Sequence, residues 1–310
     1  MNELSLFFQS AVQLGTPFLL GTLGGILGEK VGNMNLGIEG MMMMGAYFGF
    51  LGGYITENPV LAVLFAILGG MIGALIYAVI TVTLKGNQTV TGFALTIFGT
   101  GLANFLGKKY SSTIMHGSVT AALGTHTIPG LSKIPVLGTA IFSQSLFVYF
   151  SILAAIAMVF YYKKTRFGLA ARMVGESPAT ADASGIHVDR YKYIHILISG
   201  AFCGLGGAYL SLVYVPYWQD NITAGIGWIA VALVIFSGWH PVKAVFGCYL
   251  FGVLKALALK FQGITFNVVG MEIAIASQVM DMIPYILTVV VLVVAAITSK
   301  NRSVGPASIV

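Results

Sequence analysis

Five polar side chains with the chemistry to line a solute path lie within or beside long apolar segments of this 310-residue chain: Asn33, Asn35, Glu39, Gln88 and Asn104. Polar side chains inside a membrane-spanning bundle usually face its interior, because lipid cannot satisfy their hydrogen bonds. A path lined by Asn, Gln and Thr, without paired buried carboxylates, suits an uncharged polar solute rather than a proton relay or a cation filter. We therefore predict that these five residues line a translocation path.

Three of the five belong to one glycine- and asparagine-rich stretch, GEKVGNMNLGIEGMMMMGA at 28–46. Its glycines allow chain reversals, and either asparagine can cap a following helix. Glu39 would lie in the first turn of that helix, where the positive end of the helix dipole favours a carboxylate. Two interpretations stay open: a segment that dips into the membrane and contributes to the path, or a capped turn between two spans. The methionine run at 41–44 is interpreted as packing material.

A second stretch, Lys163 to Lys192, is the longest water-loving segment and holds six of the sixteen lysines and arginines. Ser177 can cap a short helix, Pro178 fits its first position, and Gly185 can end it in a left-handed conformation. A helix of about two turns is not stable alone in water, so its flanks or a docked partner must hold it.

Sequence motifs for catalysis and nucleotide binding are missing: the chain contains no Walker A pattern, HExxH, GxSxG or CxxC pair. We predict no catalytic residue, metal or cofactor, and hence no enzyme. A transporter without such motifs, or a convincing ion-coupling carboxylate, needs energy from elsewhere. The short helix in the 163–192 segment either passes motion from a soluble motor to the membrane bundle or is simply a structured loop.

The composition is that of a membrane protein, with 57% hydrophobic and 8% charged residues and a mean hydropathy of +0.90. A soluble domain usually carries about 25% charged residues. The apolar runs are continuous rather than alternating, which excludes a β-barrel. We predict an all-α polytopic membrane protein with about 8–10 transmembrane helices, at 10–28, 36–54, 60–84, 90–107, 145–162, 191–214, 222–238, 244–262 and 283–299.

The lysines and arginines support one membrane orientation, in which the 163–192 segment lies in the cytoplasm. If the segments between successive spans then alternate between the two sides, eleven lysines and arginines lie on the cytoplasmic side and five elsewhere. The N-terminus then lies outside, the C-terminus inside, and 108–144 forms an external loop with short helices. The net charge of +6 is thus explained by membrane orientation and not by nucleic-acid binding.

Two stretches hint at an inverted repeat. Residues 35–60 and 221–242 share an asparagine, a Gly-Ile start, a glycine-containing helix and a terminal Pro-Val. They belong to spans that cross in opposite directions, and repeats of that kind place a substrate path at their interface. The match is short and gapped, so chance similarity stays open. Cys203 and Cys248 are interpreted as buried free thiols.

Three stretches in order resemble the permease subunits of bacterial ABC importers: GNMNLGIEGMMMMGA, TRFGLAARMVGESPATADASGI and TAGIGWIAVALVIFSGWHPV. That class handles branched-chain amino acids, ribose and nucleosides. The nearer resemblance is to nucleoside and simple-sugar permeases, which carry a GVxNIGIEGMM-like run. It covers essentially the whole chain, so residues 1–310 are expected to form one permease domain in a bacterial plasma membrane.

The resemblance implies partners and roles. Such permeases pair with an identical or sibling permease, bind two cytoplasmic ATPase subunits and receive solute from an extracellular binding lipoprotein. The Asn35–Gly40 element is placed near the path. The Gly-Glu-x-Pro-x-x-Ala-x-x-x-Gly region docks on the ATPase as a coupling helix, and its counterparts here are Gly175, Glu176, Pro178, Ala181, Asp182, Ala183, Gly185 and Ile186. The chain departs from the pattern at Met34, where a β-branched residue is expected, and in its short N-terminus.

The predicted function is therefore an ATP-driven importer permease for nucleosides or a related small polar solute. The alternative is a partner-independent secondary carrier or channel for a small uncharged polar solute. An integral-membrane enzyme is disfavoured, because the spans lack clustered His, Asp or Cys. Ribose-like sugars, other purine-like compounds and branched-chain amino acids remain open behind nucleosides.

Overall fold

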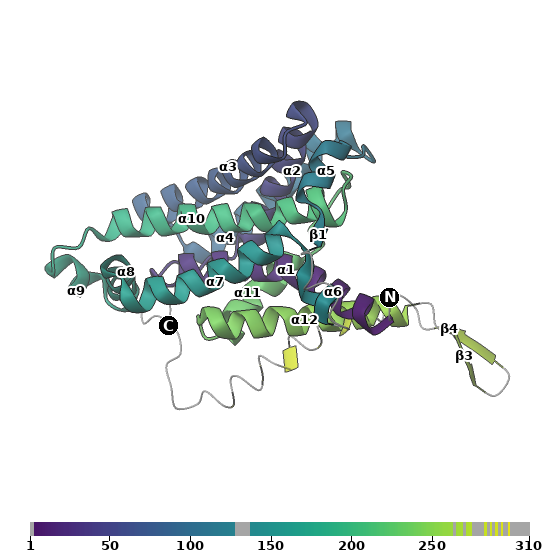
Figure 1. Cartoon of the computed structure of the whole chain (residues 1–310). Coiled ribbons are helices and arrows are strands. Elements are labelled where there is room, and N and C mark those ends of the chain that lie inside the picture. Colours follow the sequence, from purple (N-terminus) through teal and green to yellow (C-terminus); the bar gives the residue numbers. More distant parts are fainter. Residues whose placement is uncertain are drawn as a thin grey trace.

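The computed structural model describes residues 3–127, 137–262, 265–268 and 271–274, together with positions 282–283, 286, 289–290, 293 and 297. These residues are mostly helical, which confirms the all-α polytopic class (Figure 1). The elements are α1 (Glu3–Glu29), α2 (Ile38–Thr56), α3 (Pro59–Ala78), η1 (Val79–Thr83), α4 (Gln88–Gly107), η2 (Lys108–Tyr110), α5 (Gly117–Leu123), β1 (Thr125–Thr127), α6 (Leu137–Phe142), β2 (Ser143–Ser145), α7 (Leu146–Lys164), α8 (Arg166–Glu176), α9 (Pro178–Ala183), α10 (Val188–Tyr209), η4 (Leu210–Tyr214), α11 (Ile226–Phe236), α12 (Pro241–Phe261), β3 (Thr265–Val268) and β4 (Met271–Ala274).

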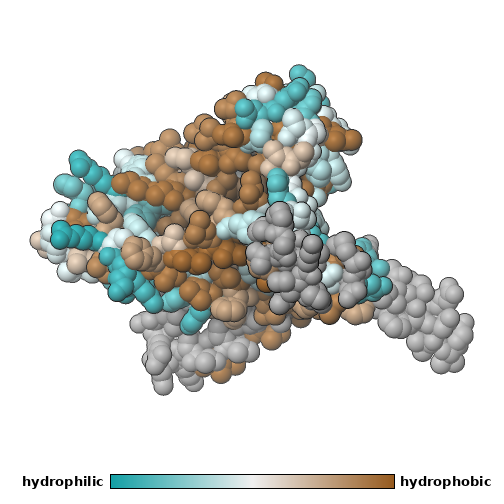
Figure 2. All heavy atoms as spheres, viewed as in Figure 1, coloured by the Kyte–Doolittle hydropathy of each residue, from teal (hydrophilic) through white to brown (hydrophobic). Residues whose placement is uncertain are grey.

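The long helices lie side by side in one bundle, with α8 and α9 at one end and α5, α6 and β1 at the other (Figure 1). An apolar surface covers the middle of the bundle, and hydrophilic residues gather at its two ends (Figure 2). That distribution matches a bilayer, whose hydrocarbon core excludes polar groups. The chain is thus a multi-pass membrane protein.

Among the described residues, six helices are long and apolar enough to cross a membrane: Glu3–Glu29, Pro59–Thr83, Gln88–Tyr110, Leu146–Lys164, Val188–Tyr214 and Pro241–Phe261. They confirm six of the predicted spans, and α2 occupies a seventh. The prediction of a complete crossing at 222–238 was wrong. The helix there, α11, has 11 residues, about 16 Å, roughly half of the hydrocarbon thickness. The ninth prediction, 283–299, lies outside the described residues apart from a few positions.

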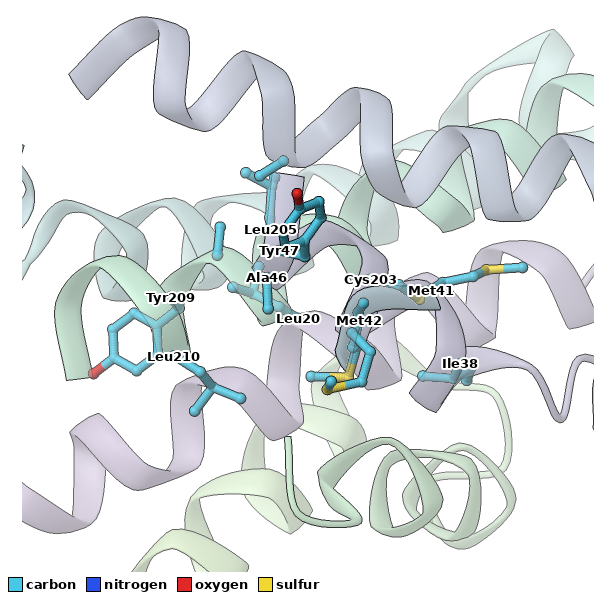
Figure 3. Close-up of a cluster of buried hydrophobic side chains, with 14 of the residues drawn as sticks. Leu20, Ile38, Met41, Met42, Ala46, Tyr47, Cys203, Leu205, Tyr209 and Leu210 are labelled. Atoms are coloured by element: carbon cyan, nitrogen blue, oxygen red, sulfur yellow. The ribbon is translucent and has the colours of Figure 1, made fainter. Parts of the chain in front are cut away.

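Helix α2 forms the centre of the bundle. Its methionines at 41–44 are all buried. Met41 and Met42 belong to one hydrophobic cluster with Leu20 of α1 and with Cys203 and Tyr209 of α10 (Figure 3). Methionine side chains fill irregular gaps in such a core. The interpretation of this run as packing material is therefore confirmed. Cys203 and Cys248 are buried free thiols, also as predicted.

Close backbone contacts between α2, α3 and α10 depend on glycine. A methyl group on Gly45 would lie 2.2 Å from the Cα of Gly204, and one on Gly70 would lie 2.1 Å from the carbonyl oxygen of Gly200. Small residues let helices approach closely where lipid provides no hydrophobic drive between them. These crossings fix the bundle against which the polar segments are held.

The segment 108–144, where it is described, contains η2, α5, β1, α6 and β2. β1 pairs antiparallel with β2 through Thr125–Ser145, His126–Gln144 and Thr127–Ser143. The prediction of irregular structure with short helices is confirmed for these residues.

The positive charges of the described residues gather at the α8–α9 end. There α1 ends and α4 begins, joined by a bond from the Gln88 amide to the Gly32 carbonyl oxygen. The segment before α12 is joined to the end of α1 by a bond from Trp239 to Glu29. The basic residues on the segments that meet at this end are Lys30, Lys85, Lys163, Lys164, Arg166, Arg172, Arg190, Lys192 and Lys243. Their grouping agrees with the predicted alternation, while the side of the membrane stays a prediction.

Candidate functional site

The segment after α1 enters the bundle before α2 begins. At its start, the Met34 N–H donates to the side-chain oxygen of Gln88 at 2.7 Å. Further along, the hydroxyl of Thr96 donates to the Leu36 carbonyl oxygen at 3.0 Å. Thr96 lies eight residues into α4 from Gln88, about 12 Å along the helix axis. The segment therefore dips into the bundle, and protein groups satisfy its open backbone as the membrane requires.

Asn33 and Asn35 are fully buried in this dipping segment. The Asn33 amide donates to the hydroxyl of Thr81 at 3.3 Å, and the Asn35 side-chain oxygen accepts from the Gly37 N–H at 2.8 Å. The expectation that an asparagine caps the next helix was wrong, because Gly37 occupies the N-cap of α2 without a side-chain bond. Their contacts shape the segment, and their place on the path stays a prediction.

Glu39 joins two helices that are far apart in the sequence. It lies in the first turn of α2 and is 7% exposed. One carboxylate oxygen accepts from the Thr223 hydroxyl at 2.5 Å and from the Gly225 N–H at 2.9 Å, and the other accepts from the Gly227 N–H at 2.6 Å. Gly225 is the N-cap of α11. The carboxylate thus caps a second helix and faces the positive dipole ends of both α2 and α11.

From this meeting point the two helices diverge. α2 ends near α5, where the Ser118 hydroxyl donates to the Glu57 carbonyl oxygen at 3.0 Å. α11 leads toward the α8–α9 end, where the Trp239 indole donates to the Glu29 carboxylate at 2.6 Å. They belong to the two stretches whose sequences hint at an inverted repeat. Discontinuous helices with facing N-termini inside the bundle are a common way to build a substrate site in transporters.

Asn104 lies apart from the other predicted path residues. It is sixteen residues along α4 from Gln88, about 24 Å. Its amide donates to the Asn221 side-chain oxygen at 2.9 Å and its oxygen accepts from the Asn221 N–H at 3.0 Å. It thereby holds the segment that leads into α11. Asn221, Thr223, Gly225 and Gly227 were not among the predicted path residues, although all four lie in the repeated stretch 221–242.

The short helix of the 163–192 segment has the predicted ends. The Ser177 hydroxyl accepts from the Thr180 N–H at 3.3 Å, and Pro178 opens α9. Gly185 has a φ of 78°, and its N–H donates to the Asp182 carbonyl oxygen at 2.9 Å. A further helix, α8, precedes it and was missed. Its signal was Thr165, whose hydroxyl caps the Gly168 N–H at 3.0 Å.

Contacts within the chain help to hold α8 and α9, as the first of the two alternatives expects; a contribution from a docked partner stays a prediction. Val174 and Ala181 are fully buried. A methyl group on Gly175 would lie 2.2 Å from the Lys30 carbonyl oxygen, which shows how closely α8 packs on the dipping segment. Of the eight predicted coupling residues, Gly175 and Ala181 face inward, Pro178 and Ile186 are half-buried, and Glu176, Asp182, Ala183 and Gly185 are exposed.

Comparisons with known proteins agree on one class. Residues 7–295 match the family described as branched-chain amino acid transport system / permease component. The chain is 34% identical over 300 residues to the guanosine ABC transporter permease protein NupQ of Bacillus subtilis, covering 93% of this chain and 91% of that protein. It is 33% identical over 303 residues to the nucleoside ABC transporter permease protein NupC of Lactococcus lactis, covering 94% and 92%.

A protein of Haloferax volcanii, provisionally named a glucose ABC transporter permease protein, TsgC13, is 35% identical over 305 residues, covering 94% of this chain and 92% of that protein. Among solved structures, the fold resembles an inward-facing ABC transporter provisionally assigned to the metal-chelate type. The TM-score is 0.52 at 13% identity, over 92% of this chain and 85% of that chain. At that identity the likeness shows the fold alone.

Proposed function

Because this chain belongs to the family of permease components of branched-chain amino acid transport systems, we propose that it moves nucleosides, or a related small polar solute, across the membrane. It is a membrane-spanning permease subunit of an ABC importer and not an enzyme. The hydrolysis of ATP belongs to a separate subunit.

The observation that carries the proposal is the meeting of α2 and α11 at Glu39 inside the bundle. Two facing helix N-termini and a polar dipping segment lie in the middle of an apolar bundle, the arrangement at which transporters commonly hold a polar solute. Two of the relatives named above are permeases for guanosine or nucleosides, and the third is named for glucose. A nucleoside contains a sugar ring, so one polar path could accept both nucleosides and simple sugars.

The α8–α9 end is the proposed docking face for the ATPase subunits and lies in the cytoplasm together with the C-terminus. The exposed residues Glu176, Asp182, Ala183 and Gly185 would make the contact, while Gly175 and Ala181 hold the face in place. The other end would receive solute from an extracellular binding lipoprotein. A second permease subunit, identical or sibling, completes the complex within the lipid.

The transport experiment uses proteoliposomes that contain the permease, its cognate ATPase subunits and binding lipoprotein, and the partner permease. Uptake of labelled guanosine that requires ATP and is lost with a hydrolysis-deficient ATPase supports the proposal. Uptake by the permease alone, driven by a solute gradient, would establish the carrier alternative. ATP-dependent uptake of labelled glucose without uptake of labelled guanosine would leave the importer in place and refute the nucleoside assignment.

The docking face is tested separately by placing one charge on it. The Ala183→Asp variant puts a carboxylate on the exposed side of α9, and Ala121→Asp makes the same change on exposed α5 at the other end. Co-purification of the ATPase subunits should fall at least about tenfold for Ala183→Asp, because a desolvated unpaired charge at an interface costs more than 1.4 kcal/mol. Equal retention by both variants would place the ATPase elsewhere.

A further inference from the structure

A cavity of about 240 Å³ lies at the α8–α9 end, between the end of α7, the face of α8 and the start of α12. Its lining includes Lys30, Lys163 and Arg172, with Tyr162 and His240. Lys163 and Arg172 are exposed at its rim, and Lys30 is half-buried. Three cationic side chains from three separate elements therefore face one small space.

The charges of these cations are only partly balanced among the described residues, where the Glu176 carboxylate acts on Lys30. Among the described residues, Lys30, Lys163 and Arg172 form no ion pair with a carboxylate. Burial lowers the pKa of Lys30, and the nearby Arg172 lowers it further, while Glu176 acts in the opposite direction. Burial likewise lowers the pKa of His240, with added repulsion from Lys163, Lys243 and Lys30. The positive charges repel one another across the cavity.

Two buried polar atoms in the lining are also unpartnered. Tyr162 is 5% exposed, and its hydroxyl has no hydrogen-bond partner among the described residues. The Nδ1 atom of His240 is buried and equally unpartnered there. Buried polar groups are normally hydrogen-bonded, because leaving one unsatisfied destabilises the folded chain. A ligand with several acceptor oxygens would satisfy the Tyr162 hydroxyl and an Nδ1–H of the neutral His240 imidazole together with the cations.

The N-terminus of α12 adds a positive electrostatic potential at this end of the bundle. His240 is its N-cap and makes no side-chain bond to the helix, and Pro241 occupies the first position. The first N–H groups of a 21-residue helix therefore face this end of the bundle with the positive end of the dipole. The nearby Glu29 carboxylate is committed to the Trp239 indole. The combination favours a compact anion over a carboxamide or a hydroxyl.

We propose that this cavity binds a phosphate group. Arg172 and Lys163 at the rim would hold its oxygens together with Lys30 and the Tyr162 hydroxyl, as charge-assisted donors do for phosphate. α7 and α12 both expose large apolar residues to lipid, such as Phe160 and Phe246. A site at the ends of lipid-facing helices is accessible both to the headgroup of an anionic phospholipid and to free phosphate.

The test uses the purified full-length chain in a neutral detergent. Its thermal midpoint is followed while short-chain phosphatidylglycerol, short-chain phosphatidylcholine or inorganic phosphate is added at constant ionic strength. Stabilisation by phosphatidylglycerol above that by phosphatidylcholine identifies a lipid headgroup. Stabilisation by inorganic phosphate alone identifies the free ion, and either result supports the site. No specific stabilisation by any of them overturns the proposal.

Matched variants assign the effect to the cavity. Lys163→Gln/Arg172→Gln should weaken the apparent affinity at least about tenfold, because two charge-assisted contacts are lost. Lys108→Gln/Lys109→Gln removes the same charge from exposed positions at the other end and should leave the affinity within about twofold. Equal weakening by both pairs would reduce the effect to general surface attraction and overturn the proposal.

Tyr162→Phe provides a second readout that does not depend on surface charge. Without ligand it should raise the thermal midpoint, because it removes an unsatisfied buried hydroxyl at nearly constant volume. With saturating ligand the variant should lose part of the ligand-induced shift. A hydroxyl that merely packs in the core would leave that shift unchanged, and this result would remove Tyr162 from the site.

Discussion

The junction of α2 and α11 makes a sharp prediction at Glu39. Replacing this residue by glutamine keeps the volume and one acceptor oxygen but turns the other oxygen into an N–H donor. If the remaining oxygen keeps its bonds from Thr223 and Gly225, the new amide faces the Gly227 N–H, which now donates at 2.6 Å to the carboxylate. Two donors would oppose each other in a buried site.

The expected cost is worked from those three bonds. Leaving the buried Gly227 N–H without an acceptor costs about 1–3 kcal/mol. Loss of the carboxylate charge removes a further 0.3–1 kcal/mol at each of the two helix N-termini, or about 0.6–2 kcal/mol together. We expect Glu39→Gln to destabilise the folded chain by about 2–5 kcal/mol in total.

The assay is thermal unfolding of the purified full-length chain in a neutral detergent, with loss of helical signal as the readout. At about 2 °C per kcal/mol, the midpoint should fall by at least about 4 °C. Glu57→Gln is the matched control. Glu57 is exposed, and its ion pair with His116 at 3.8 Å is the weak surface kind. It should therefore leave the midpoint nearly unchanged.

A double-mutant cycle with Thr223→Val tests the specific contact. If the carboxylate and the Thr223 hydroxyl interact as the 2.5 Å bond indicates, the second substitution should cost less in the Glu39→Gln background, with a coupling of at least about 0.5 kcal/mol. Strict additivity, or a midpoint for Glu39→Gln equal to that of Glu57→Gln, would refute the role of Glu39 as the clamp between the helices.

Two further predictions concern the packing around this junction. Gly175→Ala should lower the thermal midpoint and weaken retention of the ATPase subunits, because the added methyl group would lie 2.2 Å from the Lys30 carbonyl oxygen. Gly101→Ala is the control: its methyl group meets open space, so neither the midpoint nor the retention should change. Trp239→Phe should lower the free energy of unfolding by at least about 2 kcal/mol, because the buried Glu29 side chain loses the indole N–H that donates to it at 2.6 Å. Trp228 is half-buried, and Trp228→Phe should lower the free energy of unfolding clearly less in the same assay.

The sequence was most informative where one physical signal dominated. Continuous apolar runs predicted the long helices to within several residues, and the positive charges grouped them by end. The small helix α9 was predicted from three residues whose roles are local: a hydroxyl cap, a proline at the first position and a left-handed glycine. Local backbone chemistry does not depend on tertiary partners, so these features could be read directly.

The failures came where tertiary contacts decide. The segment 222–238 is apolar enough for a complete crossing, yet Gly225 and the Glu39 carboxylate start the helix at Ile226. Hydropathy cannot show that a partner from the other end of the sequence supplies the cap. Likewise, α8 was read as part of a charged loop, because its buried face of small residues carries little hydropathy signal.

The junction and the α8–α9 face are joined through the dipping segment. Gly175 of α8 packs on the Lys30 carbonyl oxygen, and nine residues after Lys30, in the first turn of α2, Glu39 clamps α11. α11 leads back to the same end, where Trp239 donates to Glu29, the residue that precedes Lys30. These backbone contacts and buried hydrogen bonds connect α8, the dipping segment and α11 with little freedom to move independently. A displacement of α8 would therefore strain the Glu39 clamp, because both depend on one short segment with its polar groups already committed.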